Sequence, residues 1–110
     1  MTICVYGAAS DQIDASFIKV VEEFGEKMAK RGHNLVYGAG ATGLMGAAAR
    51  GVKEGGGSVV GVIPTFFRDE RIEAIFDKCD ELVYTETMAE RKTIMEDKAD
   101  AFVIVPGGIG

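Results

Sequence analysis

A glycine-rich stretch from Gly38 to Gly46 holds residue types whose spacing could do chemistry. Four glycines and Thr42 stand there, directly after the apolar run Leu35–Tyr37 and directly before a helical pattern. Glycine lets a turn adopt positive φ and lets a ligand approach the backbone. A helix that begins after such a turn directs N–H groups and a partial positive charge at the loop. The stretch therefore predicts a site for an anion such as phosphate, with these binding residues: Gly38, Gly40, Thr42 and Gly43.

Two interpretations of this stretch stay open from the residues alone. The spacing Gly38-x-Gly40-x-x-Gly43 matches the fingerprint of dinucleotide-binding loops, although a single match is a weak signal. That fingerprint also expects an acidic residue at the end of the next strand, and Pro64 and Thr65 stand there instead. A nicotinamide cofactor is therefore disfavoured. A role in binding nucleotide or phosphate stands beside the alternative that the glycines only allow a strand and a helix to pack closely.

Arg91 and Lys92 form a second group of candidate residues. Residues 87–90 have the Thr-x-x-Glu form of a capping box, which predicts a helix that begins near Met88. Two cations in or just after the first turn of a helix oppose its dipole. Arg91 also shares a helical stripe with Met88 and Met95, so its side chain is predicted to lean toward the buried side.

A cation that leans inward needs an anionic partner, and the sequence offers two. Glu86 and Glu90 are near enough in the chain to form an internal salt bridge with Arg91. The other candidate is the anionic group of a substrate, bound through a charge-assisted hydrogen bond. We favour the substrate as the partner of Arg91.

The elements that position these residues follow from short apolar runs separated by tight turns. Runs without alternating polar residues are typical of strands buried on both faces of a parallel sheet. We expect an α/β fold with a doubly wound parallel sheet, with strands near residues 2–6, 34–37, 58–63, 82–84 and 101–105. The loops at the carboxyl ends of these strands should converge. Ser10, in the first of those loops, is therefore a further candidate binding residue.

Two other segments carry apolar residues in a less decisive arrangement. Residues 64–80 are interpreted as a loop and a short surface helix with one buried face, or alternatively as a segment that closes over a cleft or meets a partner chain. An amphipathic helix ending at Gly32 is predicted by apolar residues that recur every three or four positions on one face: Phe17, Val20, Val21, Phe24 and Met28.

Composition and charge limit the kind of protein. A chain of 110 residues, 47% of them hydrophobic, can form a single domain with a core. With 12 basic and 17 acidic residues, its net charge of −5 disfavours nucleic acid and anionic membranes as partners. No apolar run approaches the ~20 residues of a membrane span, and no signal peptide is recognisable. Cys4 and Cys79 lack metal-ligand or CxxC spacing, which indicates free thiols in a reducing cytoplasm.

The final apolar run, Ala101–Val105, leads into a second stretch of phosphate-loop type, Pro106–Gly110. A loop of this kind should lead into a helix. Without one, a sheet face and a strand edge would be left bare. We therefore expect residues 1–110 to form the N-terminal part of a longer, three-layer domain.

Four motifs stand in the order and spacing of a known family. They are VYGAGATGLMG (36–46), VVGVIP (59–64), MAERK (88–92) and PGGIG (106–110). Through them the chain resembles, over nearly its whole length, the Lonely Guy family of cytokinin riboside 5'-monophosphate phosphoribohydrolases, often labelled lysine decarboxylase-like. The resemblance implies a Rossmann-like fold and a homodimer with active sites near the interface.

The resemblance also implies a reaction. The N-glycosidic bond of a nucleoside monophosphate, AMP or an N6-substituted AMP, is hydrolysed to free base and ribose 5-phosphate, without a redox cofactor or a metal. The family motif makes Arg91 catalytic and Met88 and Lys92 substrate-binding. Its threonine and catalytic glutamate would follow residue 110, so the 110 residues alone are expected to be inactive. A substrate-binding loop is implied for Gly107, Gly108 and Gly110.

Two further functions remain as alternatives. One is a nucleotide-binding or regulatory module without catalysis on the same fold, and the other is a structural half-domain that assembles with another chain. A threonine and a glutamate directly after Gly110 would favour the enzyme over the first alternative. A second polypeptide that completes the sheet would support the second.

Overall fold

The structure, a computed structural model, describes residues 1–7, 15–71 and 74–105. In these ranges five strands form one sheet in which every neighbouring pair runs parallel. The strand order is β4-β3-β2-β1-β5. The predicted parallel sheet is confirmed, with strand bounds close to those expected: β1 Thr2–Tyr6, β2 Asn34–Tyr37, β3 Val59–Pro64, β4 Glu81–Thr85 and β5 Ala101–Ile104.

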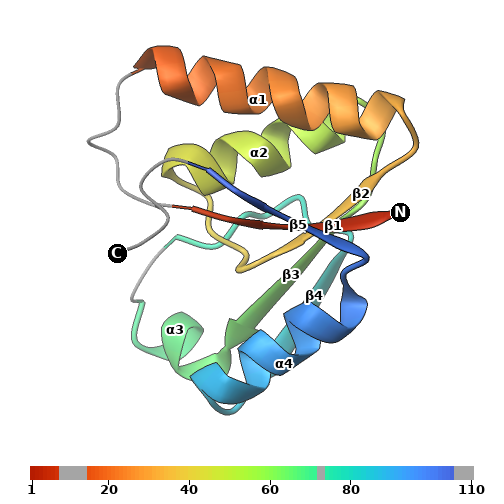
Figure 1. The fold of residues 1–110 in the computed structure, drawn as a ribbon. Coiled ribbons are helices and arrows are strands. Elements are labelled where there is room, and N and C mark those ends of the chain that lie inside the picture. Colours follow the sequence, from red (N-terminus) through yellow and green to blue (C-terminus); the bar gives the residue numbers. More distant parts are fainter. Residues whose placement is uncertain (8–14, 72–73, 106–110) are drawn as a thin grey trace.

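Helices cover both faces of the sheet. Figure 1 shows α1 and α2 on one side, and α3 and α4 on the other. Each side has its own apolar core, and the core on the α1/α2 side is the larger. The doubly wound, Rossmann-like α/β class is therefore confirmed. The helix bounds are as follows: α1 Ala15–Lys30, α2 Gly43–Glu54, α3 Thr65–Asp69 and α4 Met88–Lys98.

The strand order has a reversal beside β1. The chain moves from β1 through β2 and β3 to β4, and then α4 carries it back across the sheet to β5 on the other side of β1. In open parallel sheets, ligands bind outside the carboxyl ends of the strands at such a reversal. The carboxyl end of β1, where Tyr6 and Gly7 lie, is therefore the place at which this fold favours a site.

Glycine and alanine form the contact between α1 and α2. A Cβ added to Gly51 would lie 2.0 Å from the carbonyl oxygen of Glu22, and one added to Gly25 would lie 2.5 Å from that of Ala48. The two backbones thus touch where larger side chains would separate them. The buried residues of α1 are Val21, Gly25, Met28 and Ala29.

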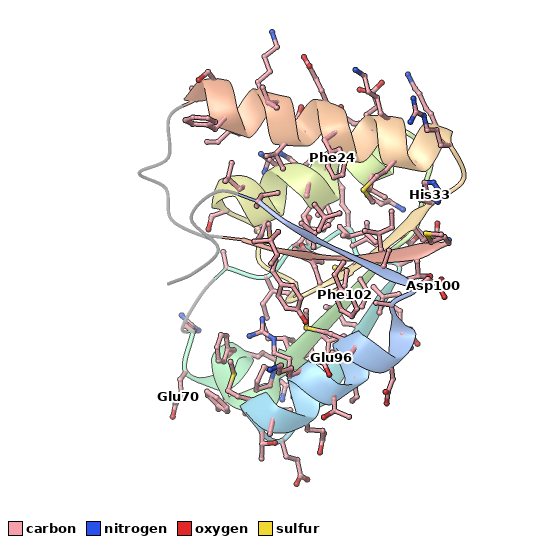
Figure 2. All side chains as sticks on the ribbon, viewed as in Figure 1. Phe24, His33, Glu70, Glu96, Asp100 and Phe102 are labelled. Carbon is pink, nitrogen blue, oxygen red and sulfur yellow. The ribbon has the colours of Figure 1, made fainter. Side chains whose placement is uncertain are left out.

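The predicted apolar face of α1 is only partly correct. Val21 and Met28 are buried, but Phe17 is 52% exposed and Val20 is 61% exposed. Phe24, labelled in Figure 2, is also classed with the exposed apolar residues. The physical reason is the glycine contact, because it draws the side of α1 that carries small residues onto α2.

The connection between β3 and β4 also differs from the predicted surface helix with one buried face. In the described part of this connection, the helix is α3, and none of its residues is fully buried. Phe76 is buried in the core on the α1/α2 side, and Ile75 forms an antiparallel bridge with Gly40. These two apolar residues therefore pack from an extended segment, which reaches the glycine loop after β2.

Two smaller expectations can be compared with the described residues. Cys4 and Cys79 are both free thiols, as predicted. Across the described ranges, no helix combines the length and the apolar character needed to cross a membrane.

Candidate functional site

A cavity of about 560 Å³ opens at the carboxyl ends of β1 and β2, between the sheet and α4. It is lined by residues from the end of β1, from the glycine loop after β2, from the start of α2 and from one face of α4. This is the position that the strand reversal favours. The lining residues most relevant to chemistry are Tyr6, Gly38, Gly40, Met88, Arg91 and Lys92.

Arg91 is held in this cavity by two backbone carbonyl groups, one within β3 and one in the loop after β2. Its Nε donates a hydrogen bond to the carbonyl oxygen of Val62 at 2.8 Å, and its Nη2 donates to that of Gly38 at 2.5 Å. The guanidinium carbon lies 5.1 Å from the centre of the Phe67 ring, a cation–π contact. The two hydrogen bonds and the ring contact together hold the guanidinium group in place.

Gly38 leaves the space that this arrangement needs. A Cβ added there would lie 2.2 Å from Arg91 Nη2, well inside van der Waals contact. Any larger residue at position 38 would displace the guanidinium from its carbonyl partners. Space for the Arg91 guanidinium is therefore a structural reason for a glycine at position 38, whether or not Gly38 also contacts a ligand.

The start of α4 agrees with the prediction. Thr87 is the N-cap, and its Oγ1 accepts a hydrogen bond from the Glu90 N–H at 3.0 Å. Glu90 returns the contact through Oε1, which accepts from the Glu86 N–H at 3.3 Å. The predicted N-cap is therefore confirmed, whereas the Glu90 carboxylate accepts from the residue before the N-cap and not from the Thr87 N–H of a complete capping box.

The stripe on α4 also has the predicted orientation. Met95 is buried, Arg91 is half-buried, and both line the cavity together with Met88. Lys92 lies at the exposed side of the same cavity. Near the N-terminus of a helix a cation is disfavoured by the dipole. In α4 the carbonyl oxygens of β3 and of the glycine loop compensate for that cost at Arg91.

The glycine loop itself serves two purposes. Gly38 and Gly40 line the cavity, whereas Thr42 and Gly43 form the start of α2 and are absent from its lining. A Cβ added to Gly46 would lie 2.1 Å from the carbonyl oxygen of Ala41, so this glycine is needed for close packing. The stretch thus contains glycines at the cavity, as ligand binding requires, and a glycine needed for close packing. Contact with a ligand stays a prediction for Gly38, Gly40, Thr42 and Gly43.

Tyr6 is an aromatic residue in the lining of the cavity. Burial raises the pKa of the Tyr6 hydroxyl to about 12, and Cys4 and Glu96 act in the same direction. Tyr6 stacks on Phe102 of β5, labelled in Figure 2, with ring centroids 6.2 Å apart. Its hydroxyl therefore stays protonated near neutral pH. The cavity is cationic at Arg91 and apolar at Tyr6, which suits a ligand with an anionic group and an apolar ring.

Several sequence predictions fall outside the described residues. Ser10 and the loop glycines Gly107, Gly108 and Gly110 belong to this group, so their part in the site stays a prediction. Sequence reasoning, in turn, missed Tyr6, Met45 and Phe67. Tyr6 could have been found from its place at the end of the first strand. Phe67 gave no signal, because its contact with Arg91 joins segments distant in the chain.

The described ranges hold no group of three or more histidine, cysteine, aspartate or glutamate side chains arranged to bind a metal ion. The described lining of the cavity combines the cations Arg91 and Lys92 with apolar and aromatic side chains and backbone groups.

Comparisons with known proteins agree with this fold and with the motifs. A cytokinin riboside 5'-monophosphate phosphoribohydrolase from Mycobacterium tuberculosis is 44% identical over 109 residues, which make up 99% of this chain and 57% of the relative. The enzyme of that name called LOG from Oryza sativa subsp. japonica is 38% identical over 98% of this chain and 44% of its own length. The chain therefore spans about half the length of these curated relatives.

Solved structures show the same architecture. The molybdenum cofactor carrier protein of Chlamydomonas reinhardtii superposes with a TM-score of 0.79 at 28% identity, over 99% of this chain and 62% of the carrier protein. The resemblance to the Lonely Guy family is thus confirmed by relatives that carry the family's enzyme name. The model of the SLOG cluster4 family matches residues 1–110, and the chain accordingly belongs to that family.

Proposed function

We propose that the protein carrying this chain hydrolyses the N-glycosidic bond of a nucleoside 5'-monophosphate, AMP or an N6-substituted AMP. Water adds across the bond, so that C1' of the ribose gains the hydroxyl group and the base leaves with the proton. The products are the free base and ribose 5-phosphate. The observation that carries the proposal is Arg91, fixed by the carbonyls of Val62 and Gly38 inside a cavity that one glycine loop borders.

The described residues fit parts of this reaction. The guanidinium of Arg91 is pre-positioned, so it can stabilise negative charge without reorganisation during the reaction. The apolar surface of Tyr6, Met88 and Met95 offers a place for a planar base. Lys92, at the exposed side, adds a second positive charge suited to the phosphate. The names of the relatives support the same substrate class.

A carboxylate is also needed, because departure of the base leaves an oxocarbenium-like sugar that an anion stabilises while it orients water. The family motif that begins at Pro106 would place this glutamate after Gly110. We therefore propose that residues 1–110 are the N-terminal part of a longer catalytic domain, and that they are inactive alone. The greater length of the relatives is consistent with this proposal.

The test is an assay of base release by the full-length protein. AMP and an N6-substituted AMP are incubated with enzyme, and free base and ribose 5-phosphate are quantified by chromatography. We expect both products in equal amounts. Adenosine, which lacks the phosphate, is the matched control and should turn over far more slowly. Binding of AMP without any base release would contradict the proposal.

A second candidate function is a binding module without catalysis. It is favoured by the structural likeness to a molybdenum cofactor carrier protein. This module would use the same cavity and Arg91 to hold an anionic ligand. The base-release assay separates the two functions, since a carrier retains its ligand unchanged.

We further propose that the protein is located in the cytoplasm, because its free thiols fit a reducing compartment.

We also propose that the protein forms a homodimer. Exposed apolar residues on α1 and β5 fit an association surface. Sedimentation equilibrium of the full-length protein tests the assembly, and a monomer mass at micromolar concentration would contradict it.

A further inference from the structure

Tyr37 carries a hydroxyl group that packing alone does not require. The residue is completely buried at the end of β2, within the core on the α1/α2 side of the sheet. Its hydroxyl donates a hydrogen bond of 2.7 Å to the carbonyl oxygen of Gly40. Phenylalanine would fill nearly the same volume without having to find a partner for a buried polar group. The hydroxyl is thus a specific tie between β2 and the glycine loop.

The loop that Tyr37 holds has a conformation that must be maintained by contacts. Ala39 has φ of 71°, in the left-handed region that residues with a Cβ seldom adopt. Two backbone hydrogen bonds tie the loop to the extended segment before β4, from Phe76 N–H to Ala39 O at 2.8 Å and from Ala41 N–H to Ala74 O at 2.9 Å. The hydroxyl of Tyr37 adds a third tie, from the strand itself.

The same loop supplies an acceptor for Arg91. The Gly38 carbonyl, two residues before Gly40, accepts from Arg91 Nη2. Tyr37 belongs to the core of one face of the sheet, whereas Arg91 reaches the loop from α4 on the other face. A change in the loop's path between residues 38 and 40 would therefore move the acceptor and release the guanidinium.

We propose that Tyr37 is a positioning residue for Arg91: its hydroxyl, through the Gly40 carbonyl, fixes the loop whose Gly38 carbonyl holds the guanidinium in the cavity. The inference rests on the proposed function for its kinetic consequence only. Its structural consequence, the immobility of Arg91, holds for an enzyme and for a binding module alike.

The first experiment measures that immobility directly. In full-length protein labelled with 15N-arginine, NMR follows rotation about the Nε–Cζ bond of Arg91, whose signal is identified by its loss in Arg91→Lys. We expect Tyr37→Phe to speed this rotation by about two- to tenfold, the equivalent of one net hydrogen bond. Replacing Tyr37 with 4-aminophenylalanine, which keeps an N–H donor at the same place, should restore the slow rotation.

Two control variants isolate the tie to Gly40. Tyr84→Phe makes the same chemical change on β4, where the ring is partly exposed and lies beneath Arg68. Cys79→Ala removes a thiol that interacts with the Tyr37 side chain. Neither control should alter the rotation of Arg91. An unchanged rotation in Tyr37→Phe, or an equal change in Cys79→Ala, would overturn the proposal.

The second experiment measures base release from AMP. We expect Tyr37→Phe to lower kcat by about two- to tenfold with little change in KM, and to have no further effect in an Arg91→Ala background. A lowered melting temperature with unchanged kcat would show a purely structural role and overturn the proposal. If the wild-type protein releases no base, the proposed function fails, and the NMR measurement still decides the role of Tyr37.

Discussion

The two faces of the sheet are packed in different ways. On one face, α2 buries a row of small residues, Ala47, Ala48 and Ala49, and its glycines bring its backbone against α1. On the other face, α4 buries only Met95 fully among its own residues. That face holds a small apolar cluster and the cavity of about 560 Å³ at the ends of the strands.

This difference separates stability from ligand binding. Backbone contact between α1 and α2 leaves little space between these two helices. Long side chains on α4 meet the sheet at Met95 and Arg91 and leave a hollow at the carboxyl ends of β1 and β2. We therefore expect substitutions on the α1/α2 face to change the free energy of unfolding, and substitutions on the α4 face to change activity.

The largest effect is expected for Arg91→Ala in the full-length protein. Loss of a fixed cation should lower kcat for base release by about 100-fold or more, the scale of one removed electrostatic stabiliser. The melting temperature should change little, because the group is half-buried beside an open cavity. Lys98→Ala removes a cation from the last turn of the same helix, away from the cavity, and should leave kcat unchanged. Wild-type turnover in Arg91→Ala would show that this arginine has a structural role and no catalytic one.

Gly51→Ala should have the largest effect on stability. The new Cβ would lie 2.0 Å from the backbone oxygen of Glu22, which has no rotamer to escape into, so the two helices must separate. We expect a loss of about 2–3 kcal/mol in the free energy of unfolding, measured by urea denaturation. The exposed Glu54→Ala, on the same helix, should stay within about 0.5 kcal/mol of wild type. A tolerated Gly51→Ala would show that the contact between α1 and α2 can adjust.

Gly38→Ala is the counterpart of that change on the side of the cavity. Its Cβ would meet the flexible end of Arg91 rather than backbone, so the side chain can move aside. We expect a roughly tenfold lower kcat, about 1.4 kcal/mol, with an unfolding free energy close to wild type. Steady-state kinetics and urea denaturation of the two glycine variants should therefore give opposite patterns. The comparison of the faces fails if Gly38→Ala unfolds the protein and keeps full activity in its folded fraction.

The smallest effect is a pH dependence at Asp80, which ties α2 to β3. Hydrogen bonds from the Lys53 ammonium and from the Val59 N–H hold the pKa of this carboxyl below its usual range. The stabilisation is therefore complete above the unfolded-state pKa of about 3.9 and disappears as the pH falls through the lower folded-state pKa.

Asp80→Asn tests this sign. Because the pair is partly exposed, we expect a loss of about 1 kcal/mol or less at pH 7. The difference from wild type in the urea midpoint should shrink steadily below about pH 4. An equal difference at pH 7 and pH 3 would mean that charge at Asp80 has no part in the contact.

Local rules predicted a large share of this molecule. The capping box of residues 87–90 placed the start of α4, because a cap is satisfied within four consecutive residues. Helical periodicity then brought Met88, Arg91 and Met95 to one side, which is the side of the cavity. The apolar runs likewise predicted five parallel strands close to their observed bounds.

Capping, periodicity and apolar runs could not predict contacts between segments that are distant in the chain. The side of α1 that is buried depended on Gly25 and Gly51 meeting across two helices, so counting apolar residues selected Phe17 and Val20 wrongly. The partner of Phe76 was also hidden, since its segment packs against the glycine loop after β2.

The sequence by itself determined which elements form and which residue types stand at the carboxyl ends of the strands, since backbone propensity, capping and periodicity act over a few neighbouring residues. Only the tertiary structure decided what holds Arg91. Its acceptors are the backbone carbonyls of Val62 and Gly38, 29 and 53 residues away in the chain. A carbonyl group is present at every residue and carries no sequence signature, so the fold alone selects which carbonyls meet the guanidinium.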